Sequence, residues 1–378
     1  MIGSEISNGF IHTVNGKITA IDEMQALASH HILDNNSVDC TGLTLYPGFI
    51  DAHCHLGMWE EGLDFEGDDG NEMTDPVTPQ LRAIDAINPM SDSFPEAVAA
   101  GITTVITGPG SANPISGQFC AMKTFGKCVD HMLLKEPVGM KFALGENPKS
   151  CYRDKDQPPT TRMAIASLIR ETLSKAKRYM DDTEDAKQDD ELDPPDFDAK
   201  LEALIPVLQR KIKAFFHCHR TDDIFTALRI TKEFNLDTVL IHCTEGHLIA
   251  DELLEANAKI ICGPLICTRS KPELKNHTTK TPAILSAKGL NVAICTDYNV
   301  VPIEYLAISG GIAVREGMTY SAALRAITIN AAEICGISDR VGSIEIGKDA
   351  DFVLYKGNPL SLSEKPVMVF INGKQVKG

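Results

Sequence analysis

Basic residues are scarce in this sequence, where 36 Lys and Arg stand against 52 Asp and Glu and give a formal net charge of −16. Binding to nucleic acid or to an anionic membrane surface requires clustered Lys and Arg side chains. The sequence also has no apolar run of about 18 residues, the length that a membrane-spanning helix needs. We therefore expect a globular protein with neither nucleic acid nor membrane as a partner.

A secretion signal is missing from residues 1–15, which contain no basic patch followed by an apolar run. The 11 cysteines form no Cys-x-x-Cys pair, and Cys243, Cys262 and Cys295 lie inside apolar runs. An odd number of thiols with this distribution favours reduced, buried cysteines over a disulfide framework. Both features predict a cytoplasmic location.

Asn-Gly pairs occur near both ends of the chain, at Asn15-Gly16 and Asn372-Gly373, between β-branched or alternating residues. Each pair predicts a β-hairpin, because Asn and Gly both tolerate the positive φ angles of a type I′ turn. We expect residues 1–47 and 340–378 to form one small β-sandwich from both termini, with a larger domain, residues 48–339, inserted between them.

The central region alternates short β-branched or apolar runs with helical patterns such as residues 164–180 and 224–234, which is typical of parallel βα units. An eighth strand either lies near residues 119–122 or is too short to recognise. Closure of the region into a (β/α)₈ TIM-like barrel is inferred from this alternation. The seven clear strands are residues 48–55, 103–107, 139–144, 213–219, 238–242, 259–262 and 291–296.

An acidic segment, residues 181–198, contains ten acids, one Lys and two consecutive prolines. Runs of like charge remain in water, so this segment is predicted to be an exposed, mobile insertion in the barrel. It accounts for −9 of the net charge of −16. The acidity of the protein is therefore largely local and carries little information about a substrate.

Histidines lie at the ends of several predicted barrel strands. His53 and His55 are two residues apart, so both side chains point to the same face of an extended strand. His217, His242 and Asp297 end three further strands. The carboxyl ends of the strands of a parallel barrel open on one face, which is where active sites lie. Imidazoles and a carboxylate that converge there predict a metal site.

These residues resemble the amidohydrolase superfamily of metal-dependent hydrolases, in particular its imidazolonepropionase-like and prolidase-like branch. The resemblance rests on the opening segment YPGFIDAHCH at residues 46–55, on the strand ends just described, and on the closing segment at residues 342–351. It spans nearly the whole chain in the family's order. It implies a barrel, a β-sandwich built from both termini, and one or two divalent metals, with zinc expected and manganese, iron or cobalt as alternatives.

By this resemblance, His53, His55 and Asp297 bind the more buried metal, and His217 and His242 bind the second. Asp297 would also act as the catalytic residue, because a carboxylate beside a metal-activated water can take up its proton and pass it to the departing amine.

The ligand that bridges the two metals is a carbamylated Lys in many members of the superfamily and a Glu in some. Lys141 and Glu146 are the candidates, and they lie on opposite faces of one strand. Glu146 is the favoured ligand because it directly follows the strand, where the other ligands lie, whereas Lys141 is expected nearer the bottom of the barrel.

Further polar residues in the loops after the strands are candidates for substrate contacts, since a cation there can clamp a carboxylate. These candidates are His219, Arg220, Lys149, Tyr298 and Gln118.

The predicted activity is cleavage of a C–N bond of a small molecule, in an amide, cyclic amide or dipeptide-like bond, by metal-bound hydroxide. Hydrolytic deamination of a small heterocycle uses the same groups and is the alternative. A non-catalytic barrel that serves as a binding or assembly protein is a further alternative. A homo-oligomer is expected.

Overall fold

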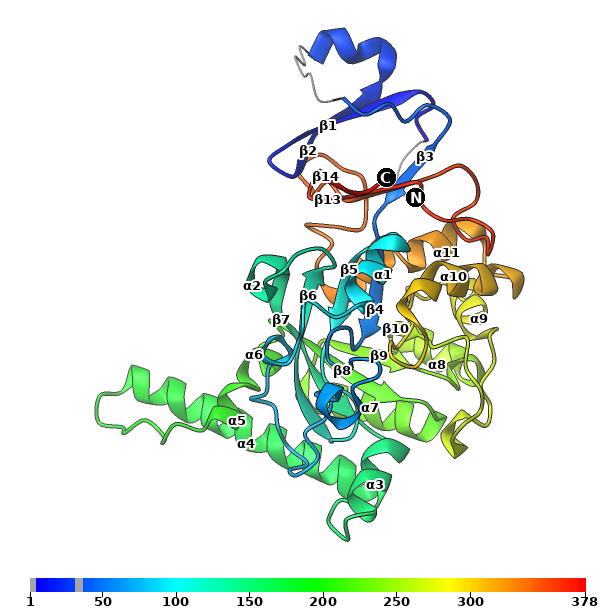
Figure 1. Cartoon of the computed structure of the whole chain (residues 1–378). Coiled ribbons are helices and arrows are strands. Elements are labelled where there is room, and N and C mark those ends of the chain that lie inside the picture. The colour runs from blue at the N-terminus through cyan, green and yellow to red at the C-terminus, as the bar shows by residue number, and fades with distance from the viewer. Residues whose placement is uncertain (1–4, 31–36) are drawn as a thin grey trace.

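The computed structural model describes residues 5–30 and 37–378, in which a strand-built barrel lies below a small β-sheet region (Figure 1). Residues 1–4 and 31–36, which belong to the predicted N-terminal segment, lie outside the described residues. Eight strands form one sheet in the order β11-β10-β9-β8-β7-β6-β5-β4. They are β4 (Phe49–Cys54), β5 (Ile102–Thr107), β6 (Ile115–Lys123), β7 (Leu133–Ala143), β8 (Lys213–Cys218), β9 (Thr238–His242), β10 (Lys259–Cys262) and β11 (Val292–Ile294).

The sheet curls until its two edge strands, β4 and β11, approach each other. Just past their ends, the Asp297 amide donates to the His53 carbonyl at 3.2 Å, and the His55 amide donates to the Tyr298 carbonyl at 2.7 Å. The predicted TIM-like barrel is thus confirmed as a nearly closed barrel of eight strands, with β6 as the eighth.

The expectation that all barrel strands are parallel is wrong at β6, which runs antiparallel to both β5 and β7. The links on either side of β6, residues 108–114 and 124–132, are short. A crossover between parallel strands needs about a dozen residues or more, so links of this length return the chain in the opposite direction.

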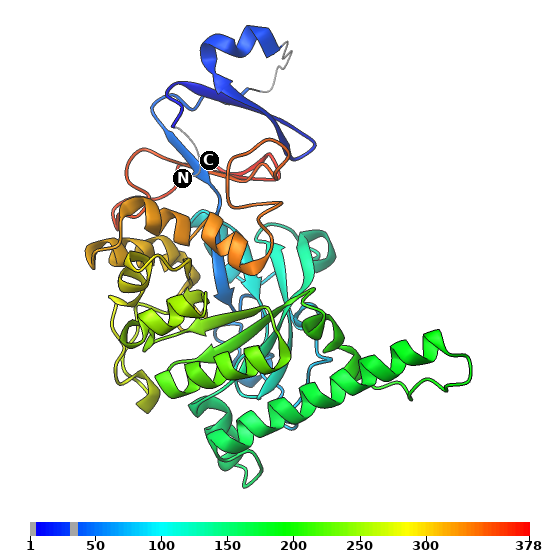
Figure 2. The same ribbon diagram turned by 180° about the vertical axis from the view of Figure 1, so that it is seen from behind.

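Helices cover the outside of the barrel (Figure 2). On α7, Ile224, Ala227 and Ile230 are buried at a spacing of three residues, which gives the helix one apolar face. The helices are α1 (Ser93–Ala99), α2 (Val129–Met132), α3 (Glu146–Arg153), α4 (Arg162–Gln188), α5 (Ala199–Glu202), α6 (Ile205–Leu208), α7 (Thr221–Phe234), α8 (Ala250–Glu255), α9 (Thr281–Ala287), α10 (Leu306–Arg315), α11 (Tyr320–Ala326) and α12 (Ile329–Cys335).

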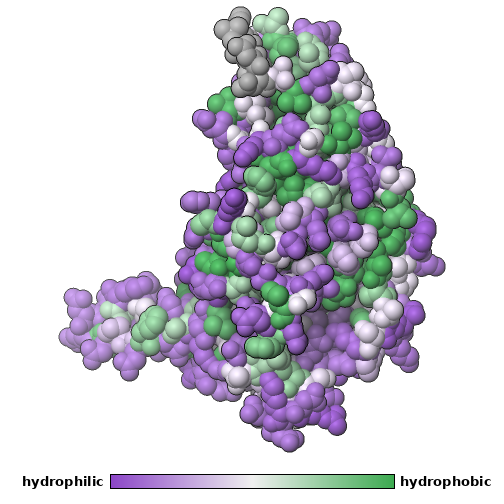
Figure 3. Space-filling view, viewed as in Figure 1, coloured by the Kyte–Doolittle hydropathy of each residue, from purple (hydrophilic) through white to green (hydrophobic). Residues whose placement is uncertain are grey.

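Helix α4 has 27 residues and projects from the barrel as an arm (Figures 1 and 2). Its first turn is capped by the Thr161 hydroxyl, which accepts from the Ala164 amide at 3.1 Å. The predicted acidic insertion, residues 181–198, begins as the end of this helix, and its side chains are mostly exposed. The surface of the arm is strongly hydrophilic (Figure 3). Within the described ranges, no helix combines the length and apolarity needed to cross a membrane.

The two predicted hairpins are present in the small β-sheet region. Asn15 and Gly16 have φ angles of 52° and 78°, and Asn372 and Gly373 have 50° and 73°, as a type I′ turn requires. The strands they join are β1 (Gly9–Val14) and β2 (Lys17–Glu23), and β13 (Met368–Ile371) and β14 (Lys374–Lys377).

Segments from both ends of the chain meet in this region. β3 (Thr44–Pro47) pairs antiparallel with β12 (Phe352–Tyr355) in a four-stranded sheet of order β14-β13-β12-β3. Ile18 of the β1–β2 hairpin packs with Phe352 and Leu354 of this sheet in one apolar cluster. The small sheet region is therefore built from residues far apart in sequence.

A buried cluster of ion pairs joins the small sheet region to the barrel. Lys123, at the end of β6, lies 3.0 Å from Asp349 and also contacts Asp351, and these three side chains are 4%, 1% and 5% exposed. Asp349 is further paired with Arg340 at 2.9 Å and with Lys17 at 2.5 Å. Lys17 is 40% exposed, so the carboxylate of Asp349 contacts one buried lysine, Lys123, and one solvent-exposed lysine, Lys17.

Replacing Lys123 by Met is expected to lower the free energy of unfolding by about 3–5 kcal/mol, because Asp351 would be left buried without its cation. The matched variant Lys17→Met should lose only about 0–1 kcal/mol, since water screens an exposed pair. Urea unfolding of both variants measures the difference. Equal losses would contradict the assignment of Lys123 as the residue that neutralises this cluster.

Candidate metal centre

The first set of possible metal ligands, which we call the Asp297 group, consists of His53, His55 and Asp297. Oδ1 of Asp297 lies 3.3 Å from Nε2 of His53 and 3.4 Å from Nε2 of His55. His53 lies on β4 and His55 directly follows this strand, and both side chains approach the same oxygen of Asp297, as strand alternation predicts. The Nδ1 atom of His55 donates to the Gly108 carbonyl at 2.7 Å, so its Nε2 atom is left with a free lone pair.

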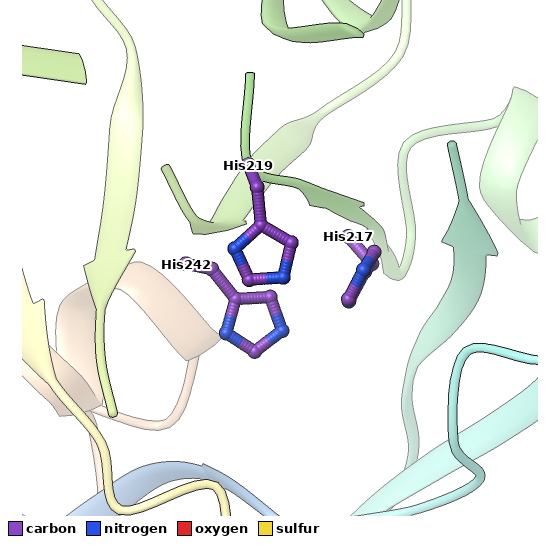
Figure 4. Close-up of side chains that lie close together, drawn as sticks. All are labelled: His217, His219 and His242. Atoms are coloured by element: carbon purple, nitrogen blue, oxygen red, sulfur yellow. The ribbon is translucent and has the colours of Figure 1, made fainter. Parts of the chain in front are cut away.

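The second set, which we call the three-histidine group, consists of His217, His219 and His242. Their rings point toward one another (Figure 4), with centroids 4.6–4.7 Å apart. His242 pairs in register with Cys218, so simple alternation would place it on the opposite face from His217. A left-handed φ of 70° at His242 breaks this alternation. Such a conformation costs of order 1–3 kcal/mol and is typical of functional sites.

Four of the imidazoles, those of His53, His217, His219 and His242, are held neutral. Burial lowers the pKa of His242 to about 4. Burial is also the main cause that brings the pKa values of His53, His217 and His219 well below their ordinary range, and neighbouring imidazoles or ammonium groups lower them further. A metal ion binds the neutral form of imidazole.

The hydrogen-bonding state of His217 fits a metal ligand. Both of its ring nitrogens are buried, and neither has a hydrogen-bond partner among the described residues. A buried polar atom without a partner is costly, and a divalent cation at the centre of three neutral imidazoles would satisfy it. The side chains present therefore fit the divalent metals that the sequence predicts.

The carboxylate of Asp297 is held ionised by its surroundings. Burial alone would raise the pKa of Asp297, but the imidazoles of His242, His53 and His55 together bring it well below its ordinary value. Beneath it, Asp51 accepts from the Thr296 hydroxyl at 2.5 Å and from the His53 amide at 3.2 Å. Asp51 thus links β4 to the segment that carries Asp297. Sequence reasoning missed this role, although Asp51 lies two residues before His53 on the same strand.

Lys141 lies at the centre of the site. Its Nζ atom is 3.3 Å from Nε2 of His53, and burial lowers the pKa of Lys141 to about 8. Lys141 pairs with Phe215, two residues before His217 on the same face of the sheet. Its long side chain extends from there into the space between the two groups.

Glu146, which the sequence favours over Lys141 as the bridging ligand, lies outside both groups. Its Oε2 atom instead accepts from the Glu273 amide at 3.0 Å. Glu146 begins α3, three residues past the last residue of β7, whereas Lys141 lies within β7. The Glu146 carboxylate is bonded to the Glu273 amide, whereas the long, flexible side chain of Lys141 extends from within the strand to His53.

A cavity of about 220 Å³ opens onto both groups and Lys141. His219, which the sequence assigned to substrate contact rather than to a metal, lines this cavity but belongs to the three-histidine group. Sequence reasoning missed Trp59, whose ring meets the ring of His55 edge to face at 4.7 Å. It also missed Lys271, Asn71 and Asn147, because loop residues follow no periodic pattern. The other polar lining side chains include Asn71, Ser111, Asn147, Ser270, Lys271, His277 and Asn299.

The remaining four predicted substrate residues do not line this cavity. Arg220 is 44% exposed and paired with Asp222 at 2.9 Å. The Gln118 side chain donates to a backbone carbonyl at 3.1 Å. Tyr298 is buried, and Lys149 lies on α3.

Glu273, in the short 3₁₀ helix η5 (Pro272–Leu274), is a further residue that no sequence pattern indicated. Its side chain is 1% exposed, and its Oε1 atom lies 2.7 Å from Nζ of Lys271. Burial alone would raise the pKa of Glu273, but His219 and Lys271 bring it below its ordinary value.

The chain matches the amidohydrolase family over residues 44–376. The solved structure of an amidohydrolase from Thermotoga maritima MSB8 is 40% identical, with a TM-score of 0.91 over 97% of this chain and 94% of that one. Amidohydrolase tasK of Hapsidospora irregularis is 28% identical over 97% of this chain, which spans only 39% of the length of tasK. An imidazolonepropionase of Fusobacterium nucleatum is 24% identical over 92% of this chain and 85% of its own length.

Proposed function

Because this chain belongs to the amidohydrolase family of metal-dependent hydrolases, we propose that it hydrolyses a C–N bond of a small molecule, in an amide, cyclic amide or dipeptide-like bond. The observation that carries the proposal is that two ligand groups open into one cavity. A cavity of about 220 Å³ suits a small substrate rather than a polymer. The polar loop side chains around it suit a substrate with several hydrogen-bonding groups.

Bound divalent metals would lower the pKa of a water molecule toward neutrality and polarise the substrate carbonyl. Asp297 would accept the proton of that water as the water oxygen bonds to the carbonyl carbon. It would then pass the proton to the nitrogen as the C–N bond breaks. The residues that would hold the ions are His53, His55 and Asp297 for one, and His217, His219 and His242 for the other.

We expect the metal-loaded protein to hydrolyse at least one class in a panel of N-acyl amino acids, dipeptides, and small cyclic amides or ureas. Release of free amine measures the activity, and treatment with a chelator should reduce it by about 100-fold or more, since the water would lose its activating charge. Adding the metal back should restore it.

The same panel, extended with small aminated heterocycles, distinguishes amide hydrolysis from hydrolytic deamination and from a non-catalytic barrel. Release of ammonium from a heterocycle, without hydrolysis of any amide, would assign hydrolytic deamination instead. A protein that binds metal but turns over no compound in the panel would favour the non-catalytic barrel.

A further inference from the structure

We propose that Glu273 supplies a carboxylate ligand to the metal ion of the three-histidine group. This inference rests on the proposed function, because it takes that group to be a metal site. It adds a ligand from η5, in the segment between β10 and α9, to a set of imidazoles that come from β8 and β9.

The two oxygen atoms of Glu273 have different surroundings. Its Oε2 atom accepts from the Glu146 amide at 2.9 Å, while the Glu146 carboxylate accepts from the Glu273 amide at 3.0 Å. This reciprocal pair fixes η5 to the start of α3. The Oε1 atom is buried, forms an ion pair with Nζ of Lys271 at 2.7 Å, and also lies beside the three-histidine group.

The distances from Oε1 fit a shared cation better than direct hydrogen bonds. Oε1 lies 3.5 Å from Nε2 of His219 and 3.7 Å from Nε2 of His217. A hydrogen bond between these atoms would span about 2.7–3.2 Å. Metal bonds of about 2.0–2.2 Å at near-tetrahedral angles separate two ligand atoms by about 3.3–3.6 Å. The 3.5 Å distance to His219 falls in this range and the 3.7 Å distance to His217 lies just above it, so the carboxylate and the two imidazoles lie near the spacing of ligands around one ion.

Lys271 supplies the positive charge that balances the buried Glu273 carboxylate. A carboxylate that is 1% exposed needs a compensating charge, and Nζ of Lys271 lies 2.7 Å from Oε1. Lys271 also donates to the Asn147 side chain at 2.8 Å and is 27% exposed, so it has a second partner and access to water. Lys271 neutralises Glu273 in the absence of metal, and a metal ion would compete with it for the same oxygen.

Glu273→Gln tests the proposal, because it keeps the size of the side chain and removes its charge. Chelator-stripped protein is titrated with Zn²⁺ against a chromophoric chelator, which gives the number of sites and both dissociation constants. The variant is expected to bind one ion as the wild type does and the other about tenfold or more weakly. The matched control is Glu245→Gln, since Glu245 is also buried but bonds to the Thr221 amide at 2.7 Å and to Asn276 at 2.8 Å.

Unchanged binding of both ions by Glu273→Gln would overturn the assignment of Glu273, as would an equal loss in Glu245→Gln. Wild-type protein that takes up no metal would instead overturn the proposed function itself, so the two failures are distinguishable.

Lys271→Met gives a second, independent test that holds even where Glu273→Gln fails to fold. Removal of the competing ammonium is expected to tighten the weaker Zn²⁺ site about tenfold. Unchanged or weaker binding would overturn the proposal, because it would mean that Glu273 serves only as the ion-pair partner of Lys271.

Discussion

Asp297→Asn is expected to lower kcat by about 10²–10⁴-fold, the range that a positioned general acid–base group contributes. Asparagine has nearly the same size and keeps an oxygen near His53 and His55, whose Nε2 atoms lie 3.3 and 3.4 Å from Oδ1 of Asp297. It cannot take up a proton at that oxygen. The carboxylate is available as a base because the surrounding imidazoles hold the pKa of Asp297 well below its ordinary value, against the effect of burial.

The measurement is kcat on whichever substrate class the panel identifies, with metal content determined on the same sample. Asp237→Asn is the control, because Asp237 pairs with Lys213 and Lys259 at 2.5 Å each, near the amino ends of the barrel strands. That variant should lose stability but keep its kcat. Wild-type kcat in Asp297→Asn would exclude Asp297 as the proton carrier.

Lys141→Ala is expected to lose one of the two metal ions and to lower kcat by about 100-fold or more. Burial lowers the pKa of Lys141 to about 8, so more of this amine is neutral near pH 7 than in a lysine of ordinary pKa. Only the neutral amine can add carbon dioxide to form a carbamate. We propose that this carbamate would serve as a metal ligand, which agrees with the position of Lys141 beside His53.

Glu146→Gln is the matched variant for this prediction. Glu146 accepts a hydrogen bond from the Glu273 amide at 3.0 Å, and a glutamine oxygen can accept the same bond. We expect this variant to keep both ions and most of its activity. Loss of an ion in Glu146→Gln together with full activity in Lys141→Ala would return the bridging role to Glu146.

The parts of the site that follow from local periodicity could be predicted from the sequence. His53 and His55 share a face because they lie two residues apart on a strand, and the same holds for His217 and His219. The Asn-Gly hairpins also follow from local turn preferences, and the structure contains both of them.

The parts that depend on the path of the backbone through space could not be predicted. The family resemblance assigned His242 to the second metal, but strand alternation alone would place it on the opposite face from His217, and its φ of 70° breaks that alternation. The choice between Lys141 and Glu146 depends on which side chain reaches the two groups in space, which spacing along one strand does not define. Glu273 and Trp59 reach the site from irregular segments, where no period relates one side chain to the next.

The most direct test of the central claim is the number of divalent ions per chain, measured by elemental analysis of protein purified without chelators. Two ligand groups of three residues each predict about two ions per chain, with turnover rising as they bind. Protein that carries no stoichiometric metal, or that turns over its substrate equally well when stripped of it, would contradict a metal-dependent hydrolase.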